Sequence, residues 1–277
     1  MEERKKNKDL FMIGKFFKNA NKINLIVILV WPIFATLLSF LFNANYLISI
    51  LLFFGVPSIY LSVINQKFVI KIALYSFIFS VPVAIILDYI AVVSGTWFMP
   101  LSVFDPFRVF GLIVVENILW VYLWVYFITI FYETFIEKDC KIKSFYPRLK
   151  YLFVVLISLT FGIVLTHFIN PTILKINFAY LKVGIILTIV PIFFAYFKFP
   201  KIYTKLLKVG MYFFTLSFLH EITGLALNQW VFTLTGTFIG WIKLGGIQFP
   251  IEEFVFFMIL GSMSIISFYE IFDDDGK

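Results

Sequence analysis

The sequence predicts an all-α integral membrane protein with eight transmembrane helices, arranged as two four-helix repeats in parallel orientation. Composition is the first indication, because 61% of the 277 residues are hydrophobic, only 14% are charged, and 38 are Phe. Soluble domains carry about 25% charged residues, so a soluble core could not bury this much apolar surface. The apolar runs are also long, whereas a transmembrane barrel shows alternating segments of about ten residues.

Eight apolar segments have the length of about 20 residues that a spanning helix needs. They are residues 24–42, 46–65, 70–93, 109–135, 150–169, 176–197, 207–228 and 249–272. Threaded through a bilayer, they leave 19 Lys and Arg residues on one side and 4 on the other. Positive residues mark the cytoplasmic side, so both termini are predicted in the cytoplasm of a multi-pass plasma-membrane protein.

Three short patterns recur in the same order in both halves of the chain, which predicts a duplication. Residues 88–97 match 221–230, 116–117 match 252–253, and 131–135 match 268–272, at offsets of 133, 136 and 137. An offset of 137 would instead pair Glu116 with Glu253. Because each half holds an even number of helices, the halves share one orientation about an axis along the membrane normal.

The predicted domain organisation follows from these two patterns. It comprises a basic cytoplasmic tail (1–23), a first four-helix repeat (24–136), a cytoplasmic linker (137–149), a second four-helix repeat (150–272) and an acidic tail (273–277).

Four of the apolar segments carry carboxylates at a similar depth from the predicted outer face. An ionisable group in lipid costs roughly 2.5–3.5 kcal/mol on insertion scales, and such groups are usually functional. The candidate catalytic acids are Asp88, Glu116, Glu221, Glu252 and Glu253. At a rise of 1.5 Å per residue they lie roughly 5–11 Å from the outer face. We expect a buried polar site there, with acids turned to interfacial water as the alternative.

Further polar and aromatic residues of this layer are candidates for binding a substrate. They are Asn117, Trp120, Trp124, His220, Phe256 and Phe257. Asn117 and His220 are predicted to support the site through hydrogen bonds. The aromatic faces suit a long apolar substrate and can stabilise a carbocation by cation–π attraction, although packing alone also explains them. Membrane-interface anchors are the interpretation of Trp97, Trp230, Trp241, Glu133 and Glu270.

Several kinds of chemistry lack their motifs. The sequence has no G-x-G-x-x-G and no G-x-x-x-x-G-K-[ST], so neither a Rossmann cofactor site nor ATP hydrolysis is expected. One cysteine, Cys140, and two histidines give no basis for a metal centre. We therefore predict no cofactor and no metal. The net charge of +7 reflects membrane topology rather than nucleic-acid binding.

One segment resembles a known signature. Pro250-Ile251-Glu252-Glu253-Phe254-Val255-Phe256-Phe257 is similar to the Pro-x-Glu-Glu-x-x-Phe-Phe motif of the membrane-embedded lycopene cyclases. That family occurs as two small subunits in some bacteria and as a fused domain in fungi and archaea. The segment 104–111 and the two acid-to-Trp segments also resemble the family, so the likeness covers about 24–272. The first half departs from the motif, with Val114-Val115-Glu116-Asn117 at the matching place.

The resemblance implies redox-neutral ring closure at the ends of a long acyclic carotene such as lycopene. A carboxylic acid protonates the terminal alkene, the neighbouring alkene attacks the cation, and a base removes a proton. Our hypothesis gives Glu252 or Glu253 the donor role, and makes Glu116, Asp88 or Glu221 the base or its network. Hydrocarbon surroundings and an adjacent acid both favour the neutral form of a carboxyl group, which a donor needs at neutral pH.

Other functions remain open at this stage. A carotenoid hydratase or another isoprenoid enzyme would use the same cation with a different outcome. A proton-coupled transporter also combines repeats with membrane acids, although the acids here gather toward one face. A structural partner that scaffolds other membrane enzymes is the last alternative. Ring type, and whether one or both ends are closed, cannot be read from the residues.

Overall fold

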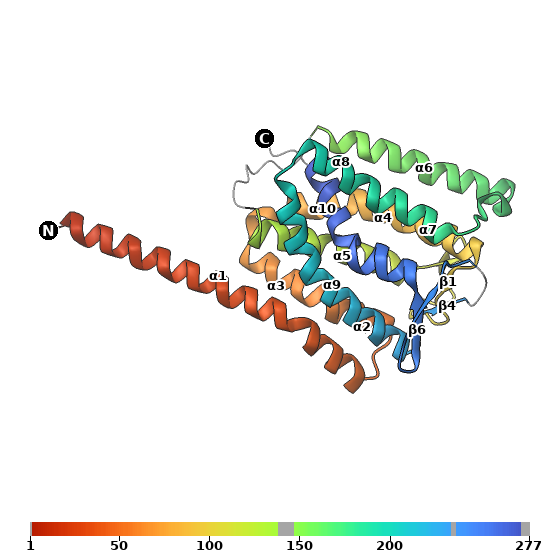
Figure 1. Cartoon of the computed structure of the whole chain (residues 1–277), viewed down its shortest axis with the longest axis horizontal. Helices are drawn as coiled ribbons and strands as arrows, with labels where there is room; N and C mark the ends of the chain where they lie inside the picture. Colours follow the sequence, from red (N-terminus) through yellow and green to blue (C-terminus); the bar gives the residue numbers. More distant parts are fainter. Residues whose placement is uncertain (1, 138–146, 234–236, 273–277) are drawn as a thin grey trace.

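Long apolar helices dominate the computed structural model, which describes residues 2–137, 147–233 and 237–272 (Figure 1). Six of the described helices are long and apolar enough to cross a membrane, and a bent pair brings the total to seven. The six are Asn21–Leu41, Tyr46–Ile64, Gln66–Ser94, Val115–Phe135, Leu149–Ile169 and Ala179–Lys198. The structure is therefore that of a mostly helical, multi-pass membrane protein, as the composition predicted.

The helices of the first half match the predicted segments, with two differences. They are α1 (Glu2–Leu41), α2 (Tyr46–Ile50), η1 (Leu51–Gly55), α3 (Val56–Ile64), η2 (Gln66–Phe68), α4 (Val69–Ser94) and α5 (Val115–Phe135). Helix α1 begins well before the predicted span, and Figure 1 shows its N-terminal part extending beyond the bundle. Helix α5 begins six residues later than the predicted start at 109, because residues before Val115 form short strands.

The second half repeats this pattern of helices. Its elements are α6 (Leu149–Ile169), η3 (Pro171–Leu174), α7 (Ala179–Gly184), η4 (Ile185–Ile189), α8 (Val190–Lys198), α9 (Ile202–Ala226), η5 (Glu253–Ile259) and α10 (Gly261–Phe272). The predicted segment 207–228 lies in α9, but α9 is not among the candidate spans. Its charged and polar residues, such as Lys208 and Glu221, lower its hydropathy. The count of eight spans thus stays a prediction.

Two of the spans contain the same interruption at corresponding places. In each, a π-helical turn, η1 or η4, is followed directly by a Val-Pro pair that contains Pro57 or Pro191. Proline has no N–H to donate to the carbonyl four residues earlier, and a π turn is one way for a helix to absorb such a break. The two prolines are 134 positions apart, close to the offsets found in the sequence. This recurrence supports the predicted duplication.

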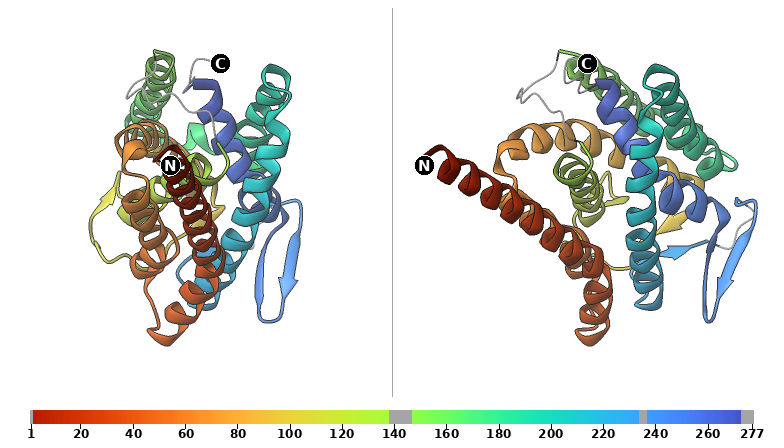
Figure 2. Two further views of the ribbon diagram at one scale, coloured as in Figure 1. Left: turned by 90° about the vertical axis from the view of Figure 1, so that its left-hand side faces the viewer. Right: turned by 60° about the vertical axis from the view of Figure 1, so that its left-hand side comes forward.

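Short antiparallel strands, which the sequence analysis did not predict, cover one end of the bundle, here called the strand end. They are β1 (Trp97–Phe98) with β4 (Val231–Phe232), β2 (Arg108–Val109) with β3 (Ile113–Val114), and β5 (Trp241–Leu244) with β6 (Ile247–Pro250). The β1–β4 pair joins the two halves of the chain. Figure 2 shows the β5–β6 hairpin at the edge of the bundle. Because β6 ends at Pro250, the last helix begins at Ile251 rather than at 249, and it bends by 49° between η5 and α10.

A group of charged and tyrosine side chains, the far-end cluster, lies at the opposite end of the bundle and is buried except for the half-buried Glu270. It comprises Lys71, Tyr132, Glu133, Tyr269 and Glu270. Lys71 Nζ lies 3.2 Å from Glu133 Oε1, and the two side chains are 2% and 0% exposed. Tyr269 also donates to Glu133, while Tyr132 donates reciprocally to Glu270. The interpretation of Glu133 as an interface anchor is therefore wrong, because its carboxylate is buried and paired.

We predict that Glu133→Leu destabilises the protein strongly, because it removes the carboxylate that forms an ion pair with the buried Lys71 ammonium. Removing one member of a buried ion pair costs about 3–5 kcal/mol. Thermal unfolding in detergent micelles measures this as a lowered Tm. The double variant Lys71→Met/Glu133→Leu should recover much of the loss, since neither charge remains. As a control, Asp105→Asn on the strand-end loop, where the carboxylate is 38% exposed, should change stability by about 0.5 kcal/mol or less. Equal Tm values for the single and double variants would contradict this account.

Candidate functional site

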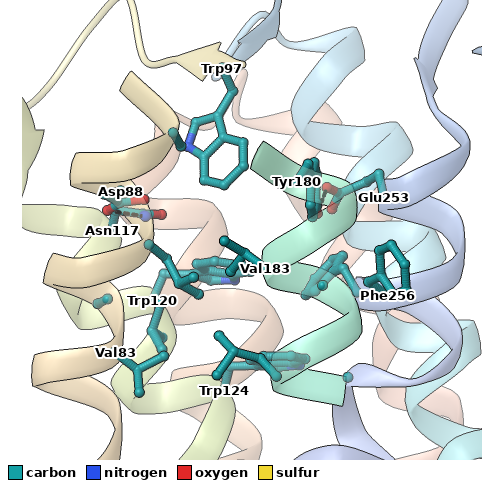
Figure 3. Close-up of a pocket in the computed structure, with 18 of the residues that line it drawn as sticks. Val83, Asp88, Trp97, Asn117, Trp120, Trp124, Tyr180, Val183, Glu253 and Phe256 are labelled. Atoms are coloured by element: carbon teal, nitrogen blue, oxygen red, sulfur yellow. Dashed lines mark hydrogen bonds between the residues drawn. The ribbon is translucent and has the colours of Figure 1, made fainter. Parts of the chain in front are cut away.

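A cavity lies just inside the strand end, between helices from both halves of the chain (Figure 3). Helices α4, α5 and α7, the turn η4 and the last helix form its walls, and α9 contributes at one side. Its volume is about 180 Å³, and its lining is almost wholly apolar. The carboxyl and amide side chains of the lining lie near the strand end, where α4 and α9 approach their C-termini and α5 and the last helix begin. The fold therefore brings helix ends from distant parts of the sequence to one layer.

The first polar group of the cavity, the Asp88 group, comes from the first half of the chain. Asn117 Nδ2 donates to Asp88 Oδ2 at 2.5 Å, and Tyr46 Oη donates to Asn117 Oδ1 at 2.6 Å. The Trp97 side chain also hydrogen-bonds to the Asp88 carboxylate. Tyr46, Asp88 and Asn117 are all buried. Every polar atom thus has a partner within the group, which holds the carboxylate in place against the cavity wall.

The second polar group, the Glu253 group, comes from the second half and lies across the cavity (Figure 3). Tyr180 donates to Glu253 Oε2, and Trp230 Nε1 donates to Glu221 Oε1 at 3.1 Å. The Glu221 and Glu253 carboxyl groups lie close enough to interact electrostatically. Two carboxyl groups this close in apolar surroundings repel each other unless one of them carries a proton. The fold therefore brings two carboxyl groups together beside the cavity.

The two groups correspond residue by residue. Tyr46 matches Tyr180 at an offset of 134, Asp88 matches Glu221 and Trp97 matches Trp230 at 133, and Asn117 matches Glu253 at 136. They also interlock through matching ring contacts. Trp97 packs on Tyr180 with ring centroids 5.2 Å apart, and Tyr46 packs on Trp230 at 5.6 Å. One chemical difference remains, because the amide of Asn117 cannot supply a proton as a carboxyl group can.

Two of the predicted catalytic acids point away from the cavity and hold strand-end loops. Glu116 Oε1 accepts from the backbone N–H of Val103 at 2.5 Å, and Glu252 Oε1 accepts from that of Ile239 at 2.7 Å. Both carboxylates are buried, and neither lines the cavity. Adjacent helical positions point about 100° apart, so turning Glu253 into the cavity turns Glu252 to the loop. Of the two proposed donors, the geometry therefore favours Glu253.

Aromatic rings from α5 and the last helix form the floor of the cavity. Trp120 and Trp124 stack with ring centroids 5.7 Å apart at 8°, and Phe257 packs on both at 5.3 and 5.0 Å. Phe256 lies against Gly184 of α7. These four predicted substrate-binding residues all line the cavity. Their faces present a negative quadrupole to anything that enters.

His220 lines the cavity but does not act as the predicted hydrogen-bonding support. Neither of its ring nitrogens has a hydrogen-bond partner among the described residues. The ring packs instead on Trp120 and Trp230, with centroids 6.1 and 5.1 Å apart. In this structure His220 behaves as a buried aromatic residue.

The sequence analysis missed four residues that hold the acids. Trp97 and Trp230 were interpreted as interface anchors, whereas their side chains bind Asp88 and Glu221. The shared spacing of nine residues between acid and Trp was the available signal. Tyr46 and Tyr180 were not singled out, although each begins or nearly begins a helix and the two are 134 positions apart.

Comparison of the chain with models of known families, with curated proteins and with solved structures finds no match. The role of the site must therefore be argued from its own residues. These provide an apolar cavity, a pair of neighbouring carboxyl groups, a separate carboxyl group across the cavity, and a stack of aromatic rings. Such a site is suited to moving protons to and from an apolar molecule.

We predict that Gly184→Ala disturbs the cavity wall and lowers stability. A Cβ atom at position 184 would lie 2.2 Å from Phe256 Cδ2, so the ring must shift toward the cavity. Overpacking of this kind typically costs about 1–3 kcal/mol, which thermal unfolding in detergent measures. Gly162→Ala is the matched control, because it also lies inside a helix and nothing stands within 4 Å of its added Cβ. The control should be neutral or stabilised by up to about 1 kcal/mol; equal effects at both positions would refute this reading of the wall.

Proposed function

We propose that this protein is a carotenoid cyclase of the lycopene cyclase type, which closes a terminal ring of a long apolar carotene by redox-neutral acid/base chemistry. The observation that carries the proposal is the closely placed pair of buried carboxyl groups, Glu221 and Glu253, beside an apolar, aromatic-lined cavity. Protonating an alkene requires an acid that is neutral and shielded from water. The likeness of residues 250–257 to the lycopene cyclase signature adds independent support.

The proposed reaction conserves atoms and electrons. The acidic proton of the Glu221–Glu253 pair moves to the terminal carbon–carbon double bond, which leaves a tertiary carbocation. The π electrons of the neighbouring double bond then form the new ring bond and move the positive charge to a ring carbon. Asp88, across the cavity, or the carboxylate formed in the first step accepts a proton from the adjacent carbon. The product is an isomer of the substrate.

The aromatic floor has a defined role in this scheme. A cation within about 6 Å of a ring face gains roughly 0.5–1 kcal/mol at exposed sites and about 2 kcal/mol or more when desolvated. Trp120, Trp124 and Phe257 lie next to one another along the cavity. They would stabilise the carbocation without reacting with it, and the apolar lining would keep water from capturing it.

The proposed membrane arrangement has eight spans in two parallel four-helix repeats, with both termini in the cytoplasm and the strand end outside. Support comes from the Lys and Arg distribution, the recurring π turns and the matched polar groups. In this arrangement α9 spans the plasma membrane with Glu221 paired rather than facing lipid. A carotene would enter from the bilayer, and association with other carotenoid enzymes would suit so insoluble a substrate.

Product mass separates this proposal from a hydratase on the same scaffold. Ring closure leaves the mass of the carotene unchanged, whereas capture of the cation by water adds one water molecule. A proton-coupled transporter would instead carry a proton flux across liposomes without changing any carotene.

We predict that Glu253→Gln and Glu221→Gln each reduce cyclisation by at least about 100-fold, because general acid catalysis typically contributes 10²- to 10⁴-fold. The test is expression in a lycopene-producing bacterial host, with pigments separated by chromatography and protein verified in the membrane. Glu252→Gln should retain more activity than either, since Glu252 binds the Ile239 backbone rather than lining the cavity.

Asp105→Asn is the control for this series, because Asp105 lies on an exposed loop and pairs with Arg108 at 3.0 Å. It should cyclise like the unmodified protein. Unchanged lycopene in cells that contain the unmodified protein in their membranes would overturn the proposed function. Full activity in both Gln variants would overturn the assignment of the acid pair.

A further inference from the structure

Several residues that line the cavity differ in kind from the residues at the corresponding positions of the other half. At the offset of 134 that relates Tyr46 to Tyr180, the cavity residues Leu187 and Thr188 correspond to Phe53 and Phe54. At the offset of 133 that relates Asp88 to Glu221, Leu87 beside the cavity corresponds to His220. Small or aliphatic side chains on one side are thus replaced by three aromatic rings on the other.

These three rings fill the corresponding space. Phe53 and Phe54 pack on His220 with ring centroids 5.2 and 4.9 Å apart, both edge to face. Phe53 and Phe54 are fully buried, and His220 is 2% exposed. Buried rings thus stand at the positions that correspond to Leu87, Leu187 and Thr188 of the cavity wall.

The polar groups differ in the same sense. Glu253 lies beside the second carboxyl group of Glu221, whereas its counterpart Asn117 is an amide that donates to Asp88. An amide cannot protonate an alkene at physiological pH. The position that corresponds to Glu253 thus carries no proton donor, just as the positions that correspond to Leu187 and Thr188 carry bulky rings.

The cavity is also too small for a whole carotene. Its volume of about 180 Å³ is below the roughly 300–1,000 Å³ typical of sites that enclose a drug-sized ligand. It is partly open, and Leu87 and Ile90 of α4 and Val183 of α7 along its side are half-exposed. The remainder of a long substrate would leave the cavity on this side and lie in lipid.

We propose that each chain holds one reaction centre, which accepts one end of a linear two-ended polyene at a time. This inference rests on the proposed cyclase function. It follows that a second ring on the same molecule forms only after the first product leaves, turns round and inserts its other end. Ring closure at the two ends is then distributive, and the singly cyclised carotene is a free intermediate or the final product.

The test is a time course with purified full-length protein in liposomes and a large excess of lycopene over protein. Chromatography separates the acyclic, singly cyclised and doubly cyclised carotenes. At low conversion nearly all product should carry one ring, and any two-ring product should appear after a lag. Isotopically labelled, singly cyclised carotene is added midway through the reaction. The labelled fraction of the two-ring product should then match the labelled fraction of the singly cyclised carotene.

Two variants test the same inference from the structure. Glu253→Gln should reduce first and second ring closures by the same factor, as a single centre requires. Phe54→Thr, which places at position 54 the residue found at 188, opens the filled space without touching the Glu253 group. It should leave the one-ring to two-ring ratio unchanged, with folding checked by Tm.

The outcomes separate this inference from the proposed function. Two-ring product without a lag, exclusion of the labelled chase, or a Glu253→Gln variant that still closes one ring would each overturn the single centre, while cyclisation itself stands. No ring from either the acyclic or the singly cyclised substrate would overturn the proposed function instead.

Discussion

The structure depends on one constraint, which is that ionisable groups inside hydrocarbon must be paired. The chain meets it in two layers, one near each end of the bundle. Near the strand end, the Asp88 group and the Glu253 group satisfy their carboxyl groups with tyrosine, tryptophan and amide donors. In the far-end cluster, tyrosines and a lysine serve the same purpose. Near the strand end each half satisfies its own carboxyl groups, whereas in the far-end cluster a tyrosine of each half donates to a glutamate of the other.

A nearly symmetric scaffold becomes an asymmetric site through a few substitutions. The matched pairs Tyr46 and Tyr180, or Trp97 and Trp230, keep the framework the same on both sides of the cavity. Asn117 stands at the position that corresponds to Glu253, and its amide cannot donate a proton as a carboxylic acid can. Bulky rings at Phe53 and Phe54 close the space there. The matched Tyr and Trp residues thus support the framework in both halves, and the unmatched residues make the two sides of the cavity chemically different.

Much of this could be predicted from the sequence, and the remainder has physical reasons. Apolar length placed most helices within a few residues, because a bilayer fixes the length of a span. The depth of Asp88, Glu221 and Glu253 was predictable by counting residues along each helix. The direction of Glu252 was not, because it depends on where the last helix begins after Pro250. Two- to four-residue strands have too few positions to show a periodicity. The packing of His220 against aromatic rings was not predictable either, because those rings come from distant parts of the sequence. From the sequence alone, a histidine among carboxylates is expected to form hydrogen bonds.

The bond from Tyr132 to Glu270 bears on how the chain is made. The two residues are 138 positions apart, and Glu270 lies close to the end of the last helix. At translation rates of about 5–20 residues per second, Tyr132 would wait roughly 7–28 s for its partner to be synthesised. During that interval the hydroxyl has Glu137, five residues away, as a partner at 3.0 Å, and its bond to Glu270 forms only when α10 arrives. Assembly of the far-end cluster is then completed by α10, and premature release of the nascent chain would leave the helix bundle incomplete.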